Sequence, residues 1–351
     1  MSAAPAPRRF LTVNAGSTSL KVSLVGPDAS TVTYPDLDAA LAASAPDAVV
    51  HRVVHGGERS QAVVVDDAVT DELRALTELA PLHQPPALAA MDRACTALPD
   101  VPHVACFDTA FHRTIPEAAA TYALPRRYRA TLHVYGFHGL SHAWAARQVA
   151  ARVPGARRVL VAHLGGGASL CAVRDGRSVD TTMGFTPLDG LVMGSRSGHV
   201  DPGALVWLVK HTGEDLEDLL ERRSGLQALA GTSDLREVER RRADGDPEAR
   251  LAFDVYLHSL LSHAGSMVAA MGGLDVLALT GGVGEHSVHV REELCAGLAW
   301  LGVDAQDDGG SLDPVRDLTV PGASVRTFVV HSREDLEMVG HARTILARTP
   351  R

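Results

Sequence analysis

Two stretches of this chain, one rich in glycine and one containing an arginine, are suited to binding an anion. Residues 159–173 read VLVAHLGGGASLCAV, where Gly165, Gly166 and Gly167 separate two strand-like apolar runs. Glycine lets backbone N–H groups approach a phosphate closely, because no Cβ is in the way. Further along, Arg196 stands in the loop sequence SRSG, where packing does not explain an arginine. Together these features indicate phosphoryl chemistry.

The elements that would position such residues occur twice in the chain. Residues 10–25, FLTVNAGSTSLKVSLV, again predict a strand, a small-residue turn and a second strand. A third glycine cluster, LTGGVGEHS at 279–287, follows another buried strand-like run and is interpreted as a nucleotide turn. Two phosphate-type hairpins and a nucleotide turn are the layout of the actin, sugar kinase and heat-shock ATPase superfamily. We therefore predict an α/β fold of two domains with a duplicated mixed-sheet core.

The other predicted elements complete this α/β pattern. Helices are expected at 247–271, closed by Gly272, and at 333–347, where Ser332 and Asp335 resemble a capping box. The segment 26–48 is expected to have little regular structure. Strands are predicted at 48–54, 101–107, 318–320 and 325–330.

Composition limits the classes of function. A length of 351 residues predicts two domains, and the net charge of −9 disfavours nucleic acid as the main partner. The four cysteines lack CxxC spacing and are expected to be reduced, as in a cytoplasmic protein. The N-terminal sequence lacks the apolar core of a signal peptide, and we expect neither a signal peptide nor a membrane span.

Several polar residues are candidates for chemistry, each with a structural alternative. Asp108 follows a buried strand, where α/β sheets bind ligands, although it could equally cap the next segment. Lys21 could bind phosphate or simply face solvent on a strand. Arg52 could bind an anion or likewise face solvent. His138 lies between glycines in an aromatic turn and stands out among seventeen histidines. No HExxH spacing occurs, so the sequence predicts no zinc site.

Taken as a whole, the sequence resembles the acetate/propionate/butyrate kinase family. The resemblance rests on nine motifs in order: VNAGSTSLK, HRVVHGGE, APLHQPP, CFDTAFH, YGFHGLSH, HLGGGASLCAV, DTTMGFTPLDGLVMGSRSGHVDPG, LTGGVGEHS and REDLEMV. It implies reversible, Mg²⁺-dependent transfer of a phosphoryl group from ATP to acetate, giving ADP and acetyl phosphate. Mn²⁺ could replace Mg²⁺. The resemblance also implies a homodimer with the active site in the cleft between two domains.

The resemblance assigns roles to individual residues. Arg52 and Arg196 match the arginines that hold acetate and the transferring group, and His138 matches a histidine that stabilises the transition state. Asp108 matches an active-site carboxylate. Asn14 and Glu334 match residues associated with the metal. Asp335 is a competing alignment for Glu334, and Glu334 could instead be an acidic residue that the helix dipole favours in the first turn.

The remaining assignments concern binding. The matches to the phosphate and nucleotide segments are Ser17, Ser19, Lys21, His163, Gly165, Gly166, Gly167, Gly281, Gly282 and Gly284. The matches to the apolar pocket for the methyl group of acetate are Val54, Leu82, Phe137 and Pro187. His83 matches a further active-site histidine.

The chain departs from the family pattern at four places. Gly166 replaces the asparagine of HLGNG, GGVGEH replaces AGIGEN, and His199 stands where aspartate is frequent. The segment before HRVVHGGE is also shorter. These changes concern nucleotide affinity and the dimer rather than the class of reaction.

We therefore expect an N-terminal domain at 1–108, joined by a returning helix at 336–351, and a nucleotide-binding and dimerisation domain at 109–335. The alternatives are a kinase for propionate or another short acid, and a nucleotide-binding protein without turnover.

Overall fold

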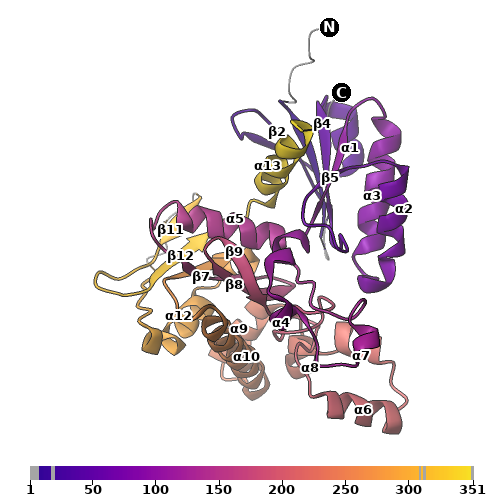
Figure 1. Ribbon diagram of the computed structural model, residues 1–351. Helices are drawn as coiled ribbons and strands as arrows, with labels where there is room; N and C mark the ends of the chain where they lie inside the picture. The colour runs from indigo at the N-terminus through magenta and orange to yellow at the C-terminus, as the bar shows by residue number, and fades with distance from the viewer. Residues whose placement is uncertain (1–7, 17–19, 308–309, 311–313, 349–351) are drawn as a thin grey trace. The chain divides into compact units, whose positions relative to one another are not determined.

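The computed structural model describes residues 8–16, 20–307, 310 and 314–348 (Figure 1). The chain divides into two compact units. The first takes residues 1–113, 137–144 and 333–351, and the second takes 114–136 and 145–332. These units differ from the expected domains at 109–113, 137–144 and 333–335.

The first unit is built on a six-stranded mixed sheet in the order β3-β2-β1-β4-β6-β5. β1, β2 and β3 form an antiparallel meander, and β4 and β6 run parallel to β1. The short strand β5 pairs antiparallel with β6 at the edge. The strands are β1 (Phe10–Ala15), β2 (Leu20–Val25), β3 (Thr31–Tyr34), β4 (Ala48–Val53), β5 (Val63–Val64) and β6 (His103–Phe107).

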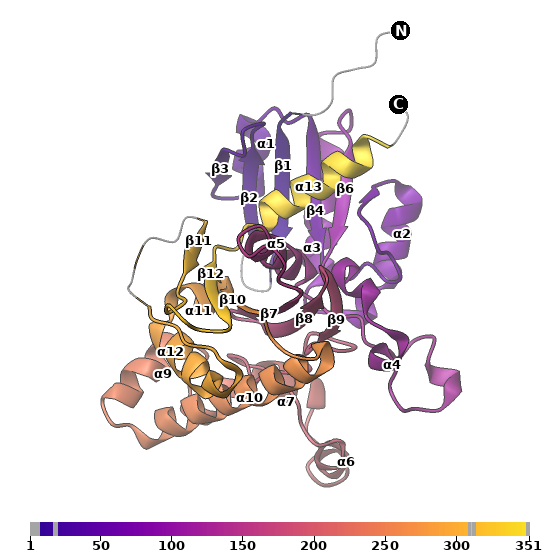
Figure 2. The same ribbon diagram turned by 60° about the vertical axis from the view of Figure 1, so that its left-hand side comes forward.

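Helices cover both faces of this sheet. On one face, α1 (Leu37–Ala43), α2 (Asp67–Ala75) and α3 (Gln84–Ala97) pack against buried strand residues such as Val49 and Val53. On the other face, α13 (Glu334–Leu346) packs against Val50 and its neighbours, and Figure 2 shows it lying across the strands. Leu140, near the start of α5 (Gly139–Ala150), joins that same core. Because successive side chains of β4 point to opposite faces of the sheet, this strand contributes to two separate hydrophobic cores.

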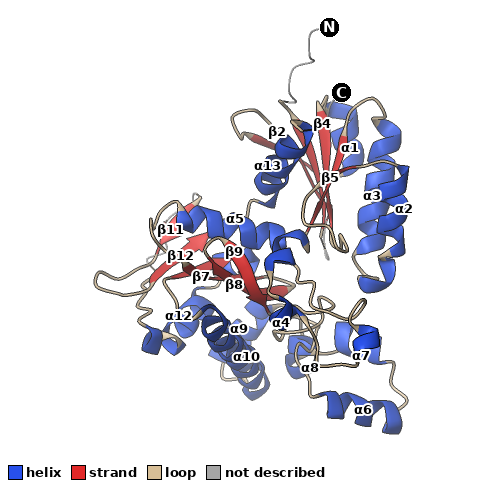
Figure 3. Ribbon diagram, viewed as in Figure 1, coloured by secondary structure: helices blue, strands red, loops and turns tan. Residues whose placement is uncertain are grey.

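The second unit repeats the same sheet design. Its strand order is β11-β12-β10-β7-β8-β9, with a β7-β8-β9 meander and with β10 and β12 parallel to β7 (Figure 3). The strands are β7 (Arg158–Leu164), β8 (Ala168–Arg174), β9 (Arg177–Thr181), β10 (Val276–Thr280), β11 (Val315–Asp317) and β12 (Arg326–Val330). The predicted duplicated α/β core is therefore confirmed.

The second unit also contains most of the helices. They are α4 (Glu117–Ala120), α6 (Pro202–His211), α7 (Leu216–Arg222), α8 (Gly225–Ala230), α9 (Leu235–Ala243), α10 (Pro247–Met271), α11 (Gly281–His286) and α12 (Val288–Gly297). Short 3₁₀ helices in the whole chain lie at Thr77–Leu79, Ala110–Thr114, Arg126–Tyr128 and Ala299–Leu301.

Helix α10 has the limits predicted from the sequence. The Asp246 side chain accepts from the backbone N–H groups of Glu248 and Ala249, Pro247 occupies the first turn, and Gly272 ends the helix at φ +76°. These are local signals, so the sequence contained them in full.

Several predicted elements were wrong. The segment 26–48 contains β3, which pairs with β2, and α1, whose N-cap Asp36 accepts from Ala39 N–H. The predicted capping box is absent, since Arg333 is the N-cap of α13 and makes no side-chain cap bond. The edge strand β11 precedes the predicted range 318–320. The glycine cluster at 279–287, interpreted as a nucleotide turn, contains the helix α11.

Candidate active site

Three polar residues stand at the carboxyl ends of three neighbouring strands in the first unit. Asn14 lies near the end of β1, Arg52 near the end of β4, and Asp108 directly follows β6. β1, β4 and β6 run parallel, with Asn14 opposite Arg52. Val50 and Cys106, two residues earlier, belong to the core under α13. Because side chains alternate along a strand, all three polar groups lie on that same face.

Arg52 holds these side chains together. Its Nε donates to Asp108 Oδ1 at 3.0 Å and its Nη2 to Oδ2 at 2.6 Å, while its Nη1 donates to Asn14 Oδ1 at 3.1 Å. The Arg52 side chain is 10% exposed and that of Asp108 is 1% exposed. The solvent-facing arginine that the strand pattern also allowed is therefore excluded. A bidentate pair with this burial is strongly directional and costly to break.

Glu334, the first residue of α13, completes this cluster. Its Oε2 accepts from Asn14 Nδ2 at 2.7 Å and lies 3.9 Å from Arg52 Nη1. The neighbouring carboxylate of Asp335 is bound instead by the Arg333 guanidinium, at 2.9 and 2.8 Å. The structure thus brings Glu334, and not Asp335, to Asn14 and Arg52.

The charges of this cluster favour a bound cation. Burial alone would lower the pKa of Arg52, but the carboxylates of Asp108 and Glu334 outweigh burial and raise that pKa above its ordinary value. Burial raises the pKa of Asp108, and the Arg52 guanidinium opposes that effect. Because the bidentate bonds from Arg52 favour the ionised carboxylate, one guanidinium faces two carboxylates, which leaves negative charge in excess. Together with the Asn14 amide, the carboxylates supply the oxygen ligands that Mg²⁺ prefers.

The turn that carries His138 is fastened to Asp108. His138 has φ +57°, a left-handed conformation that is strained for a residue with a Cβ. The next residue, Gly139, donates its N–H to the Asp108 carbonyl at 2.9 Å, and a Cβ there would stand 2.1 Å from that oxygen. The close approach explains the glycine and holds the half-buried His138 next to the Asp108 backbone.

Gln84 links the segments that carry the predicted acid pocket in the first unit. This fully buried side chain accepts from His55 N–H at 3.1 Å and donates to the carbonyls of His55 at 3.0 Å and Leu73 at 3.1 Å. It thereby joins the segment after β4, which contains Val54, to the start of α3, just after Leu82.

The pocket residues differ in exposure. Val54 is 3% and Phe137 1% exposed, and the Phe137 ring lies 5.8 Å from that of His55. Leu82 and His83 are half-buried, and Pro187, which belongs to the second unit, is buried.

In the second unit, β7 and β8 form the predicted hairpin, and its turn is Gly165–Gly167. A Cβ on Gly165 would lie 3.8 Å from both the Gly282 nitrogen and His163 Nε2. Gly281 has φ +79°, and a Cβ there would stand 2.6 Å from the Leu164 carbonyl. The hairpin turn, the end of β7 and the start of α11 therefore lie together. The glycines of these segments that the sequence singled out are Gly165, Gly166, Gly167, Gly281, Gly282 and Gly284.

Glu285 fixes the start of α11. Its carboxylate is largely buried and accepts from the backbone N–H groups of Gly281 at 3.1 Å and Ser332 at 3.0 Å. It also lies 2.7 Å from His331 Nδ1. The glycine segment is therefore tied to the end of the second unit's last strand.

Arg196 is buried in the second unit and contacts the predicted pocket residue Pro187. Its Nε donates to Glu221 Oε2 at 3.1 Å and its Nη1 to the Pro187 carbonyl at 3.4 Å. Burial lowers the pKa of Arg196, and the Glu221 carboxylate opposes that effect. Gly225, at φ +61°, leaves no room for a Cβ, which would stand 2.7 Å from the Arg196 carbonyl.

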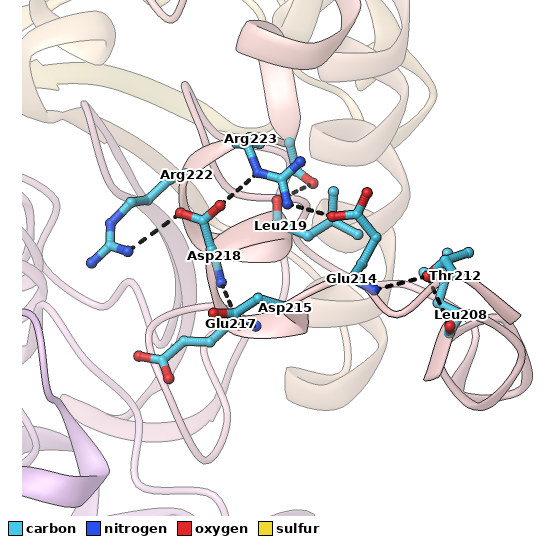
Figure 4. Close-up of polar contacts among 10 residues, drawn as sticks. Leu208, Thr212, Glu214, Asp215, Glu217, Asp218, Leu219, Arg222 and Arg223 are labelled. Carbon is cyan, nitrogen blue, oxygen red and sulfur yellow. Dashed lines mark hydrogen bonds and ion pairs between the residues drawn. The ribbon is translucent and has the colours of Figure 1, made fainter. Parts of the chain in front are cut away.

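Helix α7, which carries Glu221, is braced on its outer side by charged groups (Figure 4). Arg223 pairs with Asp218 at 2.6 Å and with Glu214 at 2.6 Å, and Asp215 caps the first turn. These groups are exposed, so each pair adds little stability.

The phosphate hairpin of the first unit is described only in part. Ser17 and Ser19 lie outside the described residues. Lys21 is exposed on β2, opposite Asn14 in the antiparallel ladder, so both side chains lie on one face.

Sequence reasoning missed Gln84, Glu221 and Glu285. Gln84 follows a histidine and precedes two prolines, and Glu285 directly follows the glycine cluster, which are weak signals. Glu221 lies in an ordinary charged helix and has no local signal.

Comparisons with known proteins identify the family of this chain. The sequence model of the Acetokinase family matches residues 36–340. An acetate kinase of Clavibacter michiganensis is 47% identical over 316 residues, covering 87% of this chain and 79% of that protein. An acetate kinase of Streptomyces coelicolor is 45% identical over 316 residues, covering 86% and 77%.

Two solved structures are also similar. A propionate kinase from Francisella tularensis has a TM-score of 0.88 at 30% identity, over 96% of this chain and 100% of that one. The acetate kinase of Entamoeba histolytica has a TM-score of 0.87 at 29% identity, over 97% and 100%. Because the family match spans most of the chain and relatives above 40% identity align with most of it, this chain belongs to the Acetokinase family.

Proposed function

We propose that this chain transfers a phosphoryl group reversibly between ATP and acetate, giving ADP and acetyl phosphate. Family membership supports this reaction, and relatives over 40% identical carry the name acetate kinase. The observation that carries the proposal is the buried Arg52 at the strand ends, bound to Asp108 and Asn14. The Arg52 Nη hydrogens that these bonds do not use are suited to holding a carboxylate or phosphoryl group.

In the first unit, Arg52 would hold the acid. Asn14, Asp108 and Glu334 would hold Mg²⁺, or Mn²⁺, since their oxygens surround the end of that guanidinium. The bound metal would neutralise phosphate charge. Asp108 would also orient Arg52, so that its fork points in one direction.

In the second unit, the Gly165–Gly167 turn and Gly282 in the first turn of α11 would bind the phosphates of the nucleotide through backbone N–H groups, while Glu285 holds the N–H of Gly281. Arg196 would stabilise charge on the transferring group, and the family resemblance gives His138 the same role. Such a loose, in-line transfer needs positioning and neutralisation more than covalent help.

The apolar residues would limit the length of the acid. Val54, Leu82 and Phe137 of the first unit are proposed to contact the methyl group, and the family resemblance gives Pro187 the same role. Val54 leaves room for a methyl and crowds an ethyl, so acetate should be preferred, propionate second and butyrate poor. One methylene in an apolar pocket is worth about 1–3 kcal/mol, or roughly 10–200-fold.

Trapping acyl phosphate as hydroxamate, with ATP and a panel of C1 to C4 acids, tests the reaction. We expect hydroxamate from acetate and less from propionate, and Val54→Ala should narrow that gap in kcat/KM. ATP binding without hydroxamate from any acid would instead favour a nucleotide-binding protein without turnover. A preference for propionate would favour the second candidate, a propionate kinase, which the similar Francisella structure makes reasonable.

We also propose a cytoplasmic homodimer. All four cysteines are free, as expected in a reducing compartment. Among the described residues, no helix is long and apolar enough to cross a membrane. The helix α6 exposes Val206, Trp207 and Val209 by more than half of their surface, as an interface with a second copy would.

A further inference from the structure

A second cluster of reactive side chains lies in the first unit, on the face of the sheet opposite Arg52. It consists of His51 on β4, His103 at the start of β6 and Cys95 on α3, and we call it the His51–Cys95–His103 cluster. One ring nitrogen from each histidine and the sulfur of Cys95 lie within 4.8 Å of one another. His51 is 1% and His103 6% exposed, and Cys95 is half-buried.

The hydrogen bonds of this cluster fix which nitrogens carry lone pairs. His103 Nε2 lies 3.0 Å from the Leu98 carbonyl, so that nitrogen must be the donor. In a neutral ring, His103 Nδ1 is then an acceptor, and it lies 3.0 Å from His51 Nε2. His51 Nδ1 is buried without a hydrogen-bond partner among the described residues.

Both imidazoles are neutral, which is the form that binds metals. Burial, with a smaller contribution from His103, lowers the pKa of His51 to about 3, and burial also lowers the pKa of His103. Two neutral rings facing each other can share only one proton between the facing nitrogens. That proton satisfies both facing nitrogens, so the polar atom that calls for an explanation in the apolar layer between the sheet and α3 is His51 Nδ1.

We propose that the His51–Cys95–His103 cluster binds one Zn²⁺ through a nitrogen of each imidazole and the Cys95 thiolate, with water as fourth ligand. Two imidazoles and a thiolate are ligands typical of zinc and poor ligands for Mg²⁺. The bond from His103 to the Leu98 carbonyl is the outer contact that usually orients a ligating histidine.

Binding requires small side-chain movements. Zn–N bonds of about 2.0–2.1 Å place two nitrogens of a tetrahedral site roughly 3.4 Å apart. The facing nitrogens, now at 3.0 Å, must therefore separate by a few tenths of an ångström, while half-buried Cys95 turns inward. Zinc binding moves the His51 proton from Nε2 to Nδ1, which gives the facing Nε2 the lone pair that the metal needs. Burial raises the pKa of the Cys95 thiol, whose proton is released to solvent on binding, so affinity should increase with pH.

The sequence spacing gave no sign of this site, since positions 51, 95 and 103 match no zinc motif. The site is also separate from the proposed magnesium ligands. Arg52 follows His51 directly but projects from the other face of β4, toward α13.

Cobalt titration of the full, EDTA-treated chain tests the proposal, because a thiolate bound to Co²⁺ gives a near-ultraviolet charge-transfer band. We expect this band to saturate at one equivalent and to disappear when Zn²⁺ is added. Cys95→Ser should abolish the band, and His103→Gln should weaken cobalt binding at least tenfold. Cys106→Ala, on the opposite face of the sheet, should leave the band unchanged.

A stability measurement gives a second readout that does not depend on phosphoryl transfer. Zn²⁺ should raise the unfolding temperature of the parent chain but not that of Cys95→Ser. Cobalt binding without a thiolate band, no binding at all, or a band that persists in Cys95→Ser would each overturn the proposal. Cobalt held by the oxygen ligands of Asn14, Asp108 and Glu334 would give no such band, so the two sites are distinguishable.

Discussion

At the scale of single residues, Arg196 offers the sharpest test of the proposed chemistry. Arg196→Ala should lower kcat roughly 10³–10⁵-fold while ATP affinity changes little, because the charge acts mainly in the transition state. Arg223→Ala removes an exposed arginine beside the same helix and serves as the control. An Arg196→Ala rate within tenfold of the parent would remove Arg196 from the mechanism.

Gly166 is a second residue whose substitution should be informative. A Cβ at Gly166 would meet no atom within 4 Å, so the turn has space for a side chain. Gly166→Asn should therefore tighten ATP binding through one new hydrogen bond to phosphate, worth about 1.5–3 kcal/mol, or roughly tenfold to a hundredfold in Kd. Gly340→Asn, at an exposed position where a Cβ likewise meets no atom within 4 Å, is the control. Unchanged ATP affinity in Gly166→Asn would mean that this turn binds phosphate by its backbone alone.

Buried histidines should make stability depend on pH. Burial lowers the pKa of His51 to about 3 and that of His112 to about 4, from 6.5 in the unfolded chain. Below pH 6.5 the unfolded state binds protons that the folded state does not, so stability is present above 6.5 and is lost as pH falls toward these values. From pH 6.5 to 5, each histidine should remove about 2 kcal/mol from the free energy of unfolding.

Urea unfolding at pH 7 and pH 5, in EDTA, measures this loss for the parent and for His51→Gln. The variant should lose less stability than the parent over that interval. Equal losses would show that His51 does not contribute to the pH dependence.

At the scale of elements, Gln84 joins the end of β4 to the start of α3. Gln84→Leu leaves the His55 N–H and the His55 and Leu73 carbonyls without their buried partner. We expect a loss of at least about 2 kcal/mol in stability, and a larger rise in KM for acetate than for ATP. Gln227→Leu, at an exposed position, should change neither quantity. Equal rises in both KM values would mean that Gln84 has no specific effect on the acid pocket.

At the scale of the whole molecule, contact with a second copy would explain the exposed apolar side chains of α6. Both Figures 1 and 2 show it apart from the sheet of its own unit, and Val206, Trp207 and Val209 are 53%, 56% and 63% exposed. Burying such side chains on association yields about 25 cal/mol per Å² of apolar surface. Light scattering should therefore find a dimer for the parent and a shift toward monomer for Trp207→Asp. Trp300→Asp, 73% exposed on another helix, is the control, and a monomeric parent would contradict the proposal.

Local sequence signals determined a large part of the fold. The strand–turn–strand units around Gly16 and Gly166 predicted the duplicated sheets, because alternation and glycine turns are properties of neighbouring residues. Asp246, Pro247 and Gly272 defined α10 for the same reason. The segment 26–48 was misjudged because β3 exists through its pairing with β2, a contact outside its own sequence.

Tertiary structure decided which polar residues meet. The sequence pattern did not decide whether Arg52 faces solvent or the site. It also did not decide whether Glu334 or Asp335 is the carboxylate of the site. The answer depends on parallel pairing of β1, β4 and β6 and on α13, which returns from the far end of the chain to that face. Likewise, His51, Cys95 and His103 are brought together only when α3 packs on the opposite face. Sequence fixes the direction of side chains within one element, but contacts between distant elements arise only from their packing.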